Sequence, residues 1–420
     1  MTKTTVVSVL ALSAALATAG MNLESPLSPK AAFAAEAGKK TVSNALGKQF
    51  TDANALVQQK KFKEAIAKLD ELKAAPNKTA YETFLMNELY SAAYIGVQDY
   101  AKAAAAMDAS LDTGQAPENT KQARRKNIVT MYFTAKNYPK FNEESAKFQK
   151  DFGTDLDMQS LQVQLLYQQN NFKGAAEAGR ALVKAAETKG APVKEDWLKL
   201  VRFSEHEAGN AAGESAALDQ LLQKFPSQQY WSDALIMAQR NIKGSTKVQL
   251  EIYRLMNQTN TLTKPDDYVS MAQLSLQANV PGEAKKVVDA GIQKKVLGEG
   301  NQRDRHLRLQ NMANTTTDEA NKGLAAAETE AKAAATGDAE LHMGEVYWAA
   351  GQQDKAVAAI QSGLKKGVKD KDEAQLRLGV AHLAQNKKPQ ATEAFKAITP
   401  NSPWAQLARL WTLASATKQS

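Results

Sequence analysis

Cysteine is absent from the 420 residues of this chain, and histidine is scarce. The lack of cysteine excludes disulfides, thiolate nucleophiles and cysteine-ligated metals. It also excludes a lipidated N-terminus, which needs a cysteine at the processing site. The four histidines are His206, His306, His342 and His382, and none has a second histidine or a carboxylate at a metal-ligand spacing such as HExxH. We therefore expect neither a metal nor a cofactor.

Aromatic residues are also few, at 7%, while hydrophobic residues reach 43% and charged residues 23%. These values are normal for a folded chain, and the abundant Ala, Leu, Lys, Gln and Glu favour helices over strands. The formal charge is +8, or +7 once residues 1–34 are removed with Lys3, Lys30 and Glu24. Basic clusters such as Arg124-Arg125-Lys126 indicate solvated helix faces, and no basic stripe with interleaved aromatics points to nucleic acid.

The chain lacks an apolar run of the ~20 residues that a membrane-spanning helix needs. Its longest apolar stretch, residues 6–16, follows Lys3 and precedes small residues at cleavage positions, which is typical of a secretory signal. We favour cleavage after Ala34, with Ala19 as the alternative site and an uncleaved anchor as the other interpretation. The sequence thus predicts a signal peptide over 1–34, a flexible N-terminus over 35–40 and a periplasmic protein.

A unit of about 36 residues recurs along the rest of the chain. The first four copies read as a helix, a short polar turn, an aromatic residue and a second helix, which in most of them has a small residue in its first turn. In the first copy, Gln59-Lys60-Lys61 is followed by Phe62 and Ala65. Equivalent positions fall 34 to 39 residues apart, at 65, 103, 141, 175, 214, 250, 284, 320, 356 and 391, with weaker copies near Glu214, Leu250 and Ala320. Such a period is typical of a helical solenoid.

The best copies resemble the tetratricopeptide repeat (TPR) family. One carries Gly344, Tyr347, Gly351, Ala356 and Ile360, and the next carries Gly379, Ala391, Phe395 and Pro403. The resemblance covers roughly residues 41–404. It implies an all-α, right-handed superhelical solenoid of about ten helix-turn-helix repeats, in which each repeat contacts only its neighbours.

The array is expected over residues 41–401, and a capping helix and tail over 402–420. Ser402 and Pro403 start this last helix well, as N-cap and first helical residue. Its apolar face includes Trp404 and Trp411, as a terminal cap on the solenoid requires.

No catalytic set emerges from the sequence. Asp155 and Asp157 could suggest paired carboxylates, but their place before a helix favours capping. No Ser-His-Asp set can be assembled, and we expect no enzyme.

The TPR resemblance implies a concave groove that receives partner proteins. One position near the end of each first helix is mostly apolar or aromatic: Val57, Ile95, Phe133, Tyr167, His206, Ile242, Leu276, Met312, Trp348 and Leu383. These residues either pack between repeats or form a binding stripe, with Phe133, Tyr167 and Trp348 as anchors. We expect a scaffold that binds partner proteins; the alternative is a module for anionic envelope polymers such as peptidoglycan or polysaccharide.

Overall fold

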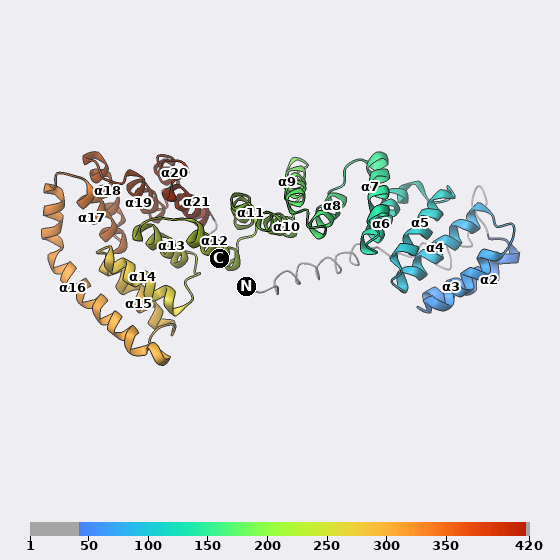
Figure 1. The fold of residues 1–420 in the computed structure, drawn as a ribbon, viewed down its shortest axis with the longest axis horizontal. Helices are drawn as coiled ribbons and strands as arrows, with labels where there is room; N and C mark the ends of the chain where they lie inside the picture. The colour runs from blue at the N-terminus through green and yellow to red at the C-terminus, as the bar shows by residue number, and fades with distance from the viewer. Residues whose placement is uncertain (1–41, 417–420) are drawn as a thin grey trace. The chain divides into compact units, whose positions relative to one another are not determined.

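The computed structural model describes residues 42–416, in which twenty α-helices and two short 3-10 helices are present and no strand occurs (Figure 1). The all-α class expected from composition is confirmed. The predicted signal peptide and both of its cleavage sites lie outside the described residues. Within them, no helix is both long and apolar enough to cross a membrane.

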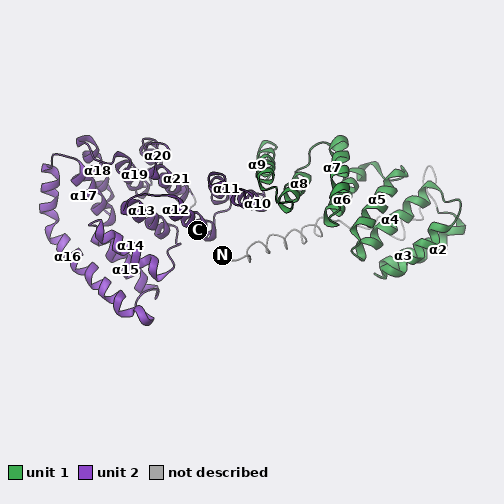
Figure 2. Cartoon of the chain, viewed as in Figure 1, with its two compact units in different colours: residues 1–193 green, residues 194–420 purple. Residues whose placement is uncertain are grey.

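The helices belong to two compact units, divided between Val193 and Lys194 (Figure 2). Unit 1 contains α2 (Asn44–Gln58), α3 (Phe62–Ala74), α4 (Ala80–Gly96), α5 (Tyr100–Asp112), α6 (Lys121–Thr134), α7 (Tyr138–Phe152), α8 (Leu156–Gln168) and α9 (Phe172–Thr188). Unit 2 contains α10 (Glu195–Glu207), α11 (Ala211–Lys224), α12 (Gln228–Asn241), α13 (Thr246–Gln258), α14 (Pro265–Gln277), α15 (Pro281–Gln293), α16 (Arg303–Ala333), α17 (Asp338–Ala349), α18 (Gln353–Lys366), α19 (Lys371–Ala384), α20 (Lys388–Lys396) and α21 (Pro403–Ala416).

Eight helix pairs share one turn. Three residues link the helices, and the middle one has a positive φ: Lys60, Gln98, Lys136, Asn170, Gly209, Asn279, Gly351 and Asn386. Glycine and asparagine tolerate this left-handed conformation best, which accounts for their frequency here. In the fourth pair, Asn171 then caps α9 by accepting a hydrogen bond from the Gly174 N–H. The predicted helix-turn-helix unit is therefore confirmed in these eight pairs.

The small residues predicted in each second helix lie where its partner helix comes closest. Ala65, Ala103 and Ala356 are completely buried. In the last pair the small residue is in the first helix: Gly379 of α19 leaves room for the Phe395 ring of α20, because a Cβ added at Gly379 would lie 2.2 Å from that ring. The spacing that produced the TPR resemblance is thus the spacing of close helix contacts.

Two of the three weaker copies depart from the unit. Around Ala320 no turn exists: residue 320 is exposed within α16, a single helix of 31 residues. The reason is local, because this stretch is rich in strong helix formers and its isolated Gly323 is followed by Leu and three Ala. Leu250 is buried in α13, but the linker from α12 is an irregular loop over residues 242–245.

Unit 2 closes on itself through its last helix. α21 begins at Pro403 as predicted, and the Ser402 hydroxyl accepts a hydrogen bond from the Ala405 N–H. The helix contacts α19 and α20, its sequence neighbours, and also α13 and α11. Trp411 Nε1 donates to Glu251 Oε1 at 2.6 Å, across 160 residues of sequence. The expectation that every repeat contacts only its neighbours is therefore wrong for unit 2.

Candidate functional site

A network of charged side chains lies in the middle of unit 2. Arg254 of α13 binds Glu283 of α15 with two nitrogens, Nε and Nη2, each 2.7 Å from a carboxylate oxygen. Its Nη1 lies 3.2 Å from oxygens of Glu251 and Glu345. Arg377 of α19 contacts the same two carboxylates. Four helices from distant parts of the sequence are thereby joined at one point.

The charge of Arg254 is held by this network. Burial of the guanidinium opposes the charged form, but Glu283 and Glu345 more than offset burial and raise the pKa of Arg254 above its ordinary value. A buried bidentate pair of this kind fixes orientation as well as charge. The arrangement is that of a structural anchor, because each charged group in it contacts a group of opposite charge.

The network also orients two tryptophans. The Arg254 guanidinium lies over the Trp348 ring, 5.4 Å from its centroid, in a cation–π contact. Glu251, which also contacts Arg254, accepts a hydrogen bond from the Trp411 indole N–H. Both rings are therefore held by groups that are themselves fixed.

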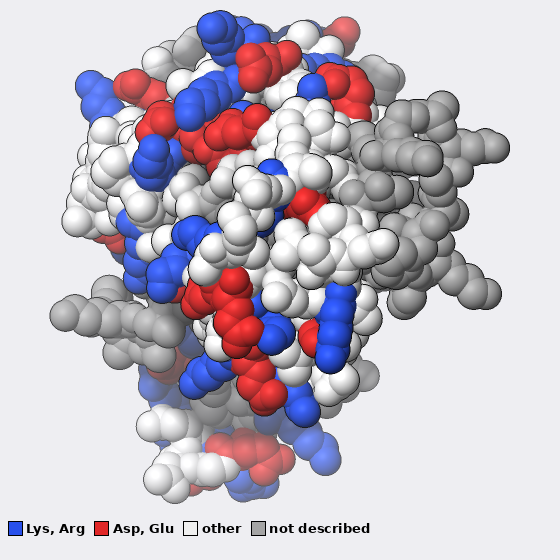
Figure 3. Space-filling view, turned by 90° about the vertical axis from the view of Figure 1, so that its right-hand side faces the viewer, with Lys and Arg blue, Asp and Glu red and all other residues white. Residues whose placement is uncertain are grey.

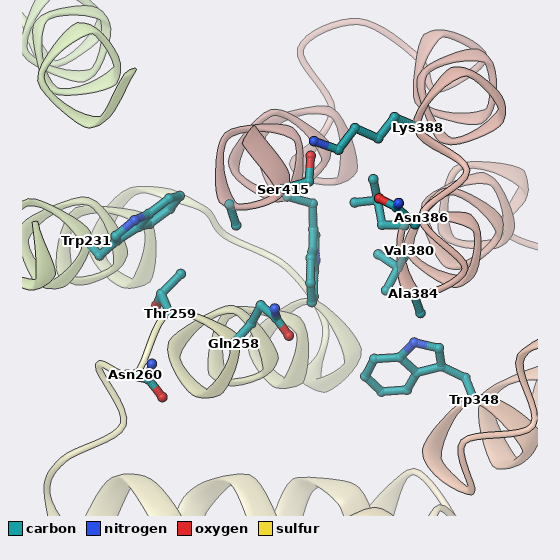
Figure 4. Close-up of a pocket in the computed structure, with 13 residues that line it drawn as sticks. Trp231, Gln258, Thr259, Asn260, Trp348, Val380, Ala384, Asn386, Lys388 and Ser415 are labelled. Atoms are coloured by element: carbon teal, nitrogen blue, oxygen red, sulfur yellow. The ribbon is translucent and has the colours of Figure 1, made fainter. Parts of the chain in front are cut away.

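These two rings line a cavity of about 400 Å³, here called the tryptophan cavity (Figure 4). Its walls come from six helices and two turns: Trp231, Gln258, Thr259, Asn260, Trp348, Val380, Leu383, Ala384, Asn386, Lys388, Trp411, Ala414 and Ser415. Figure 4 shows Trp348 and Gln258 pointing into the space and Lys388 reaching toward Ser415. A smaller hollow of about 140 Å³ shares Gln258, Trp348 and Trp411 and ends on Arg254 and Glu283.

Two of the three predicted anchors, Phe133 and Tyr167, belong to unit 1, and Trp348 belongs to unit 2. Each is the penultimate residue of its helix: Phe133 in α6, Tyr167 in α8 and Trp348 in α17. Phe133 packs against Tyr138 and Phe141 of the following helix, and Tyr167 packs edge-on against Phe172. Trp348 instead lines the tryptophan cavity.

The repeat-equivalent register holds for eight of the ten positions. Val57, Ile95, His206, Leu276 and Leu383 are also penultimate in their helices. The register fails at two positions. Ile242 lies just after the end of α12, and Met312 lies inside α16 with 58% of its surface exposed. These are the places where the helix pairs themselves are irregular.

The basic cluster at 124–126 is paired rather than simply solvated. Arg124 binds Glu88 at 2.5 Å, Arg125 contacts Asp108 and Glu144, and Lys126 binds Asp155 and Asp157. Figure 3, which views one end of unit 1, shows blue and red side chains intermixed with white on that face. The visible face therefore carries no extended field of one sign.

The capping interpretation of Asp155 is confirmed. Its Oδ1 accepts hydrogen bonds from the N–H groups of Asp157 and Met158 at the start of α8. Among residues 42–416, no group of three or more His, Asp or Glu side chains is placed to hold a metal ion.

Sequence reasoning missed most of the tryptophan cavity. Trp411 was expected to cover only the final repeat, and Trp231 gave no periodic signal because α12 lies outside the regular pairs. One signal was available: three of the five tryptophans of the chain line this cavity.

Comparisons with known proteins give fold neighbours only. No family model matches the sequence. No curated protein matches it. Among solved structures, the C-terminal part of a TPR repeat-containing protein from Cytophaga hutchinsonii is 11% identical, with 77% of this chain and 97% of that chain covered and a TM-score of 0.34. A tetratricopeptide repeat protein from Parabacteroides merdae is 11% identical, covering 78% and 99% with a TM-score of 0.29. A structure of Naa15/Naa10 bound to HypK-THB contains a chain that is 12% identical. The match covers 86% of this chain and 66% of that chain, with a TM-score of 0.29.

The architecture rests on the chain's own geometry. Eight helix pairs repeat one three-residue turn, and alanines or glycines occupy the points of closest approach. Within residues 42–416 the chain is an all-helical repeat protein, and its paired helices carry the pattern that resembles the TPR family.

Proposed function

We propose that this chain is a non-enzymatic scaffold that binds partner proteins through the TPR-like helix pairs. The observation that carries the proposal is the repeated placement of an apolar or aromatic side chain near the end of the first helix, in seven of the eight regular pairs. Phe133, Tyr167 and Trp348 are only partly buried there, so each keeps surface available to a partner. Partly exposed aromatic side chains are frequent centres of binding energy in protein interfaces.

Two further features support a scaffold over an enzyme. The buried charges of unit 2 pair with one another, as in the bidentate contact of Arg254 with Glu283. The carboxylates Asp155 and Asp157 are engaged by helix capping and by Lys126. Each of these groups already has the partner that a substrate would need to displace.

The place of action that we propose is the bacterial periplasm or cell envelope, after export and removal of the signal peptide. The support is the sequence of residues 1–34 and their Ala32-Phe33-Ala34 ending. N-terminal analysis of the protein from a periplasmic fraction is expected to read from Ala35. A start at Gly20 would move the cleavage site, and an intact Met1 in the cytoplasm would contradict export.

The interaction surface can be tested by photo-crosslinking in living cells. A photoreactive phenylalanine derivative replaces Tyr167 in one variant, Phe133 in a second and Trp348 in a third. We expect a discrete crosslinked protein from at least one position, identified by mass spectrometry. The matched control is Phe152, an aromatic residue at the end of α7 with 36% of its surface exposed.

If a protein crosslinked equally from Phe152, the crosslinks would reflect the exposure of these side chains and not a binding surface. If none of the three positions gave a discrete product while all variants stayed folded, the three side chains would be assigned to packing. Far-ultraviolet circular dichroism of each variant verifies the fold.

The surface-charge alternative receives less support. Binding to anionic envelope polymers through a general positive surface needs unpaired cations, whereas the cluster at 124–126 is neutralised by acidic neighbours. Sedimentation with peptidoglycan that vanishes on raising the salt concentration would favour this alternative.

A further inference from the structure

We propose that the tryptophan cavity of unit 2 binds an acidic oligosaccharide, with one pyranose ring against Trp348 and the carboxylate of another sugar unit at Lys388. The inference goes beyond the protein scaffold, because it concerns a small ligand in a cavity rather than a partner on a surface. Its volume of about 400 Å³ lies within the range of ligand sites, roughly 300–1,000 Å³.

The walls of the cavity divide into an apolar part and a polar part. Trp348, Trp411, Val380, Leu383 and the two alanines supply flat or smooth apolar surface. Gln258, Thr259, Asn260, Asn386 and Ser415 supply amide and hydroxyl groups. A sugar ring has the matching division, since its C–H groups form flat faces and its hydroxyls form a polar rim.

Trp348 is built to offer a ring face. Arg254 occupies one face of its indole, and the ring points into the cavity (Figure 4). Trp411 is fixed by its hydrogen bond to Glu251 at 2.6 Å. Since both rings are held by the buried charge network, a ligand meets preorganised aromatic surfaces, and little side-chain ordering opposes binding.

The charge of the cavity points to an anion. Lys388 is the single charged residue among the thirteen that line it, and none of the thirteen is acidic. Lys388 is exposed, and within residues 42–416 no carboxylate pairs with it. Figure 4 shows Lys388 extending toward Ser415, on the side of the cavity opposite Trp348. A carboxylate on one sugar unit of an oligosaccharide can therefore be bound by Lys388 while the ring of another unit contacts Trp348.

A peptide fits these walls less well. An apolar peptide side chain is bound best in an enclosed apolar pocket, whereas here amides and hydroxyls line the space together with the rings. A peptide that binds as an extended strand also needs a row of paired donors and acceptors. Gln258 and Asn386 are single side chains at separate points of the rim.

The test is a titration of the full chain with a trimer of galacturonic acid, with the uncharged galactose trimer as the matched ligand. Tryptophan fluorescence reports binding directly, because all five tryptophans lie in unit 2. We expect a saturable change with the acidic trimer and a weaker one with the neutral trimer. Raising the salt concentration should reduce this difference.

Variants locate the site. Trp348→Ala should weaken binding of the acidic trimer at least about tenfold. Lys388→Gln should weaken it by up to about fivefold and leave the neutral trimer unaffected. Lys365→Gln, on exposed surface of α18, is the charge-matched control and should change nothing. Gln258→Ala provides a second rim variant that leaves the buried network intact.

Three outcomes would overturn the proposal. The first is no saturable binding of the acidic trimer by the folded protein at millimolar concentration. The second is binding that is unchanged in Lys388→Gln and Gln258→Ala. The third is saturable binding of a short apolar peptide with a free C-terminal carboxylate in place of the sugar. None of these bears on the crosslinking experiment, which reads a protein partner.

Discussion

At the scale of single residues, Arg254 has 1% of its side chain exposed and yet contacts three carboxylates. The substitution Arg254→Met removes the charge and leaves Glu283 buried without its cationic partner, while Glu345 keeps only its contact with Arg377. Breaking a buried pair from one side typically costs about 3–5 kcal/mol of stability. We expect a loss of that size in the free energy of unfolding of unit 2, measured by urea denaturation with tryptophan fluorescence.

The control for this change is Lys285→Met. Lys285 pairs with Asp289 at 2.8 Å, but both side chains are 40% exposed. An exposed pair contributes about 0–1 kcal/mol, so the control should change the stability little. Equal effects of the two substitutions would show that the Arg254 network is not a special anchor.

A second residue, His342, gives unit 2 a pH dependence. Burial lowers the pKa of His342 below its ordinary value of 6.5, with Lys247 acting in the same direction and Glu345 opposing. The unfolded chain therefore binds the proton more tightly than the folded chain, so stability is full above pH 6.5 and is lost as the pH falls through 6.5. Urea denaturation between pH 8 and pH 5.5 should show this loss.

His342→Gln should flatten the same profile, because glutamine does not titrate. The comparison is confined to pH 5.5 and above to keep the carboxylates ionised. A profile that is identical in the wild type and in His342→Gln would assign the pH dependence to other groups.

At the scale of secondary structure, α16 differs from every other helix in carrying an exposed glycine in its interior. A Cβ added at Gly323 meets nothing within 4 Å, and glycine in a helix interior is less favourable than alanine by roughly 0.5–1 kcal/mol. Gly323→Ala should therefore stabilise unit 2 by that amount. Thermal unfolding followed by circular dichroism measures it.

Gly363 is a second glycine inside a helix, and there we expect the substitution by alanine to destabilise unit 2. It is buried in α18, and a Cβ there would lie 2.7 Å from the backbone oxygen of Gly337. Gly363→Ala should lower the melting temperature, because backbone atoms cannot move aside as a flexible side chain can. Similar effects at both sites would contradict the close packing of α17 and α18.

The helix pairs were largely predictable from the sequence, and the irregular elements were not. Turns such as Asn170-Asn171 followed by Phe172 combine a left-handed residue, a cap and an aromatic, and they repeat at a fixed period. This local signal locates the pair without tertiary information. α16 gave the same period by coincidence, since Ala320 falls 36 residues after position 284 although no turn interrupts the helix.

The tryptophan cavity could not be derived in the same way. Its walls include Trp231 and Trp411, which lie 180 residues apart and meet only because α21 returns to α13. A sequence period indicates contacts between neighbouring helix pairs. The contact of α21 with α13 joins distant helices, so the sequence period does not indicate it. The penultimate position of Trp348 was correctly identified, whereas its neighbours in the cavity were not.

At the scale of the whole molecule, the chain should separate into two fragments that fold alone. Each unit has its own core: Phe141 and Phe148 are buried in unit 1, and Trp231 and Tyr268 in unit 2. We expect fragments 35–193 and 194–420, expressed separately, both to unfold cooperatively on heating. Loss of helical structure in both fragments would contradict the division.

Deletion inside unit 2 should have consequences that deletion in an open array would lack. Removing α17 and α18 takes away Glu345 and Trp348. It also removes the helices that precede α19, against which α21 packs. We expect the whole of unit 2 to lose protection from amide hydrogen exchange while unit 1 keeps its own. If the remaining helices of unit 2 stayed protected, the closing contacts of α21 would be dispensable.

The return of α21 to α13 also bears on synthesis. A ribosome makes the chain from its N-terminus at about 5–20 residues per second, and domains generally fold as units while they emerge. Unit 1 can fold while unit 2 is still being made. Unit 2 needs the Trp411 indole for Glu251, and Trp411 is synthesised 160 residues after Glu251. A nascent chain truncated before Trp411 therefore lacks the contact that closes unit 2 and leaves the apolar faces of α13 and α19 open to chaperones.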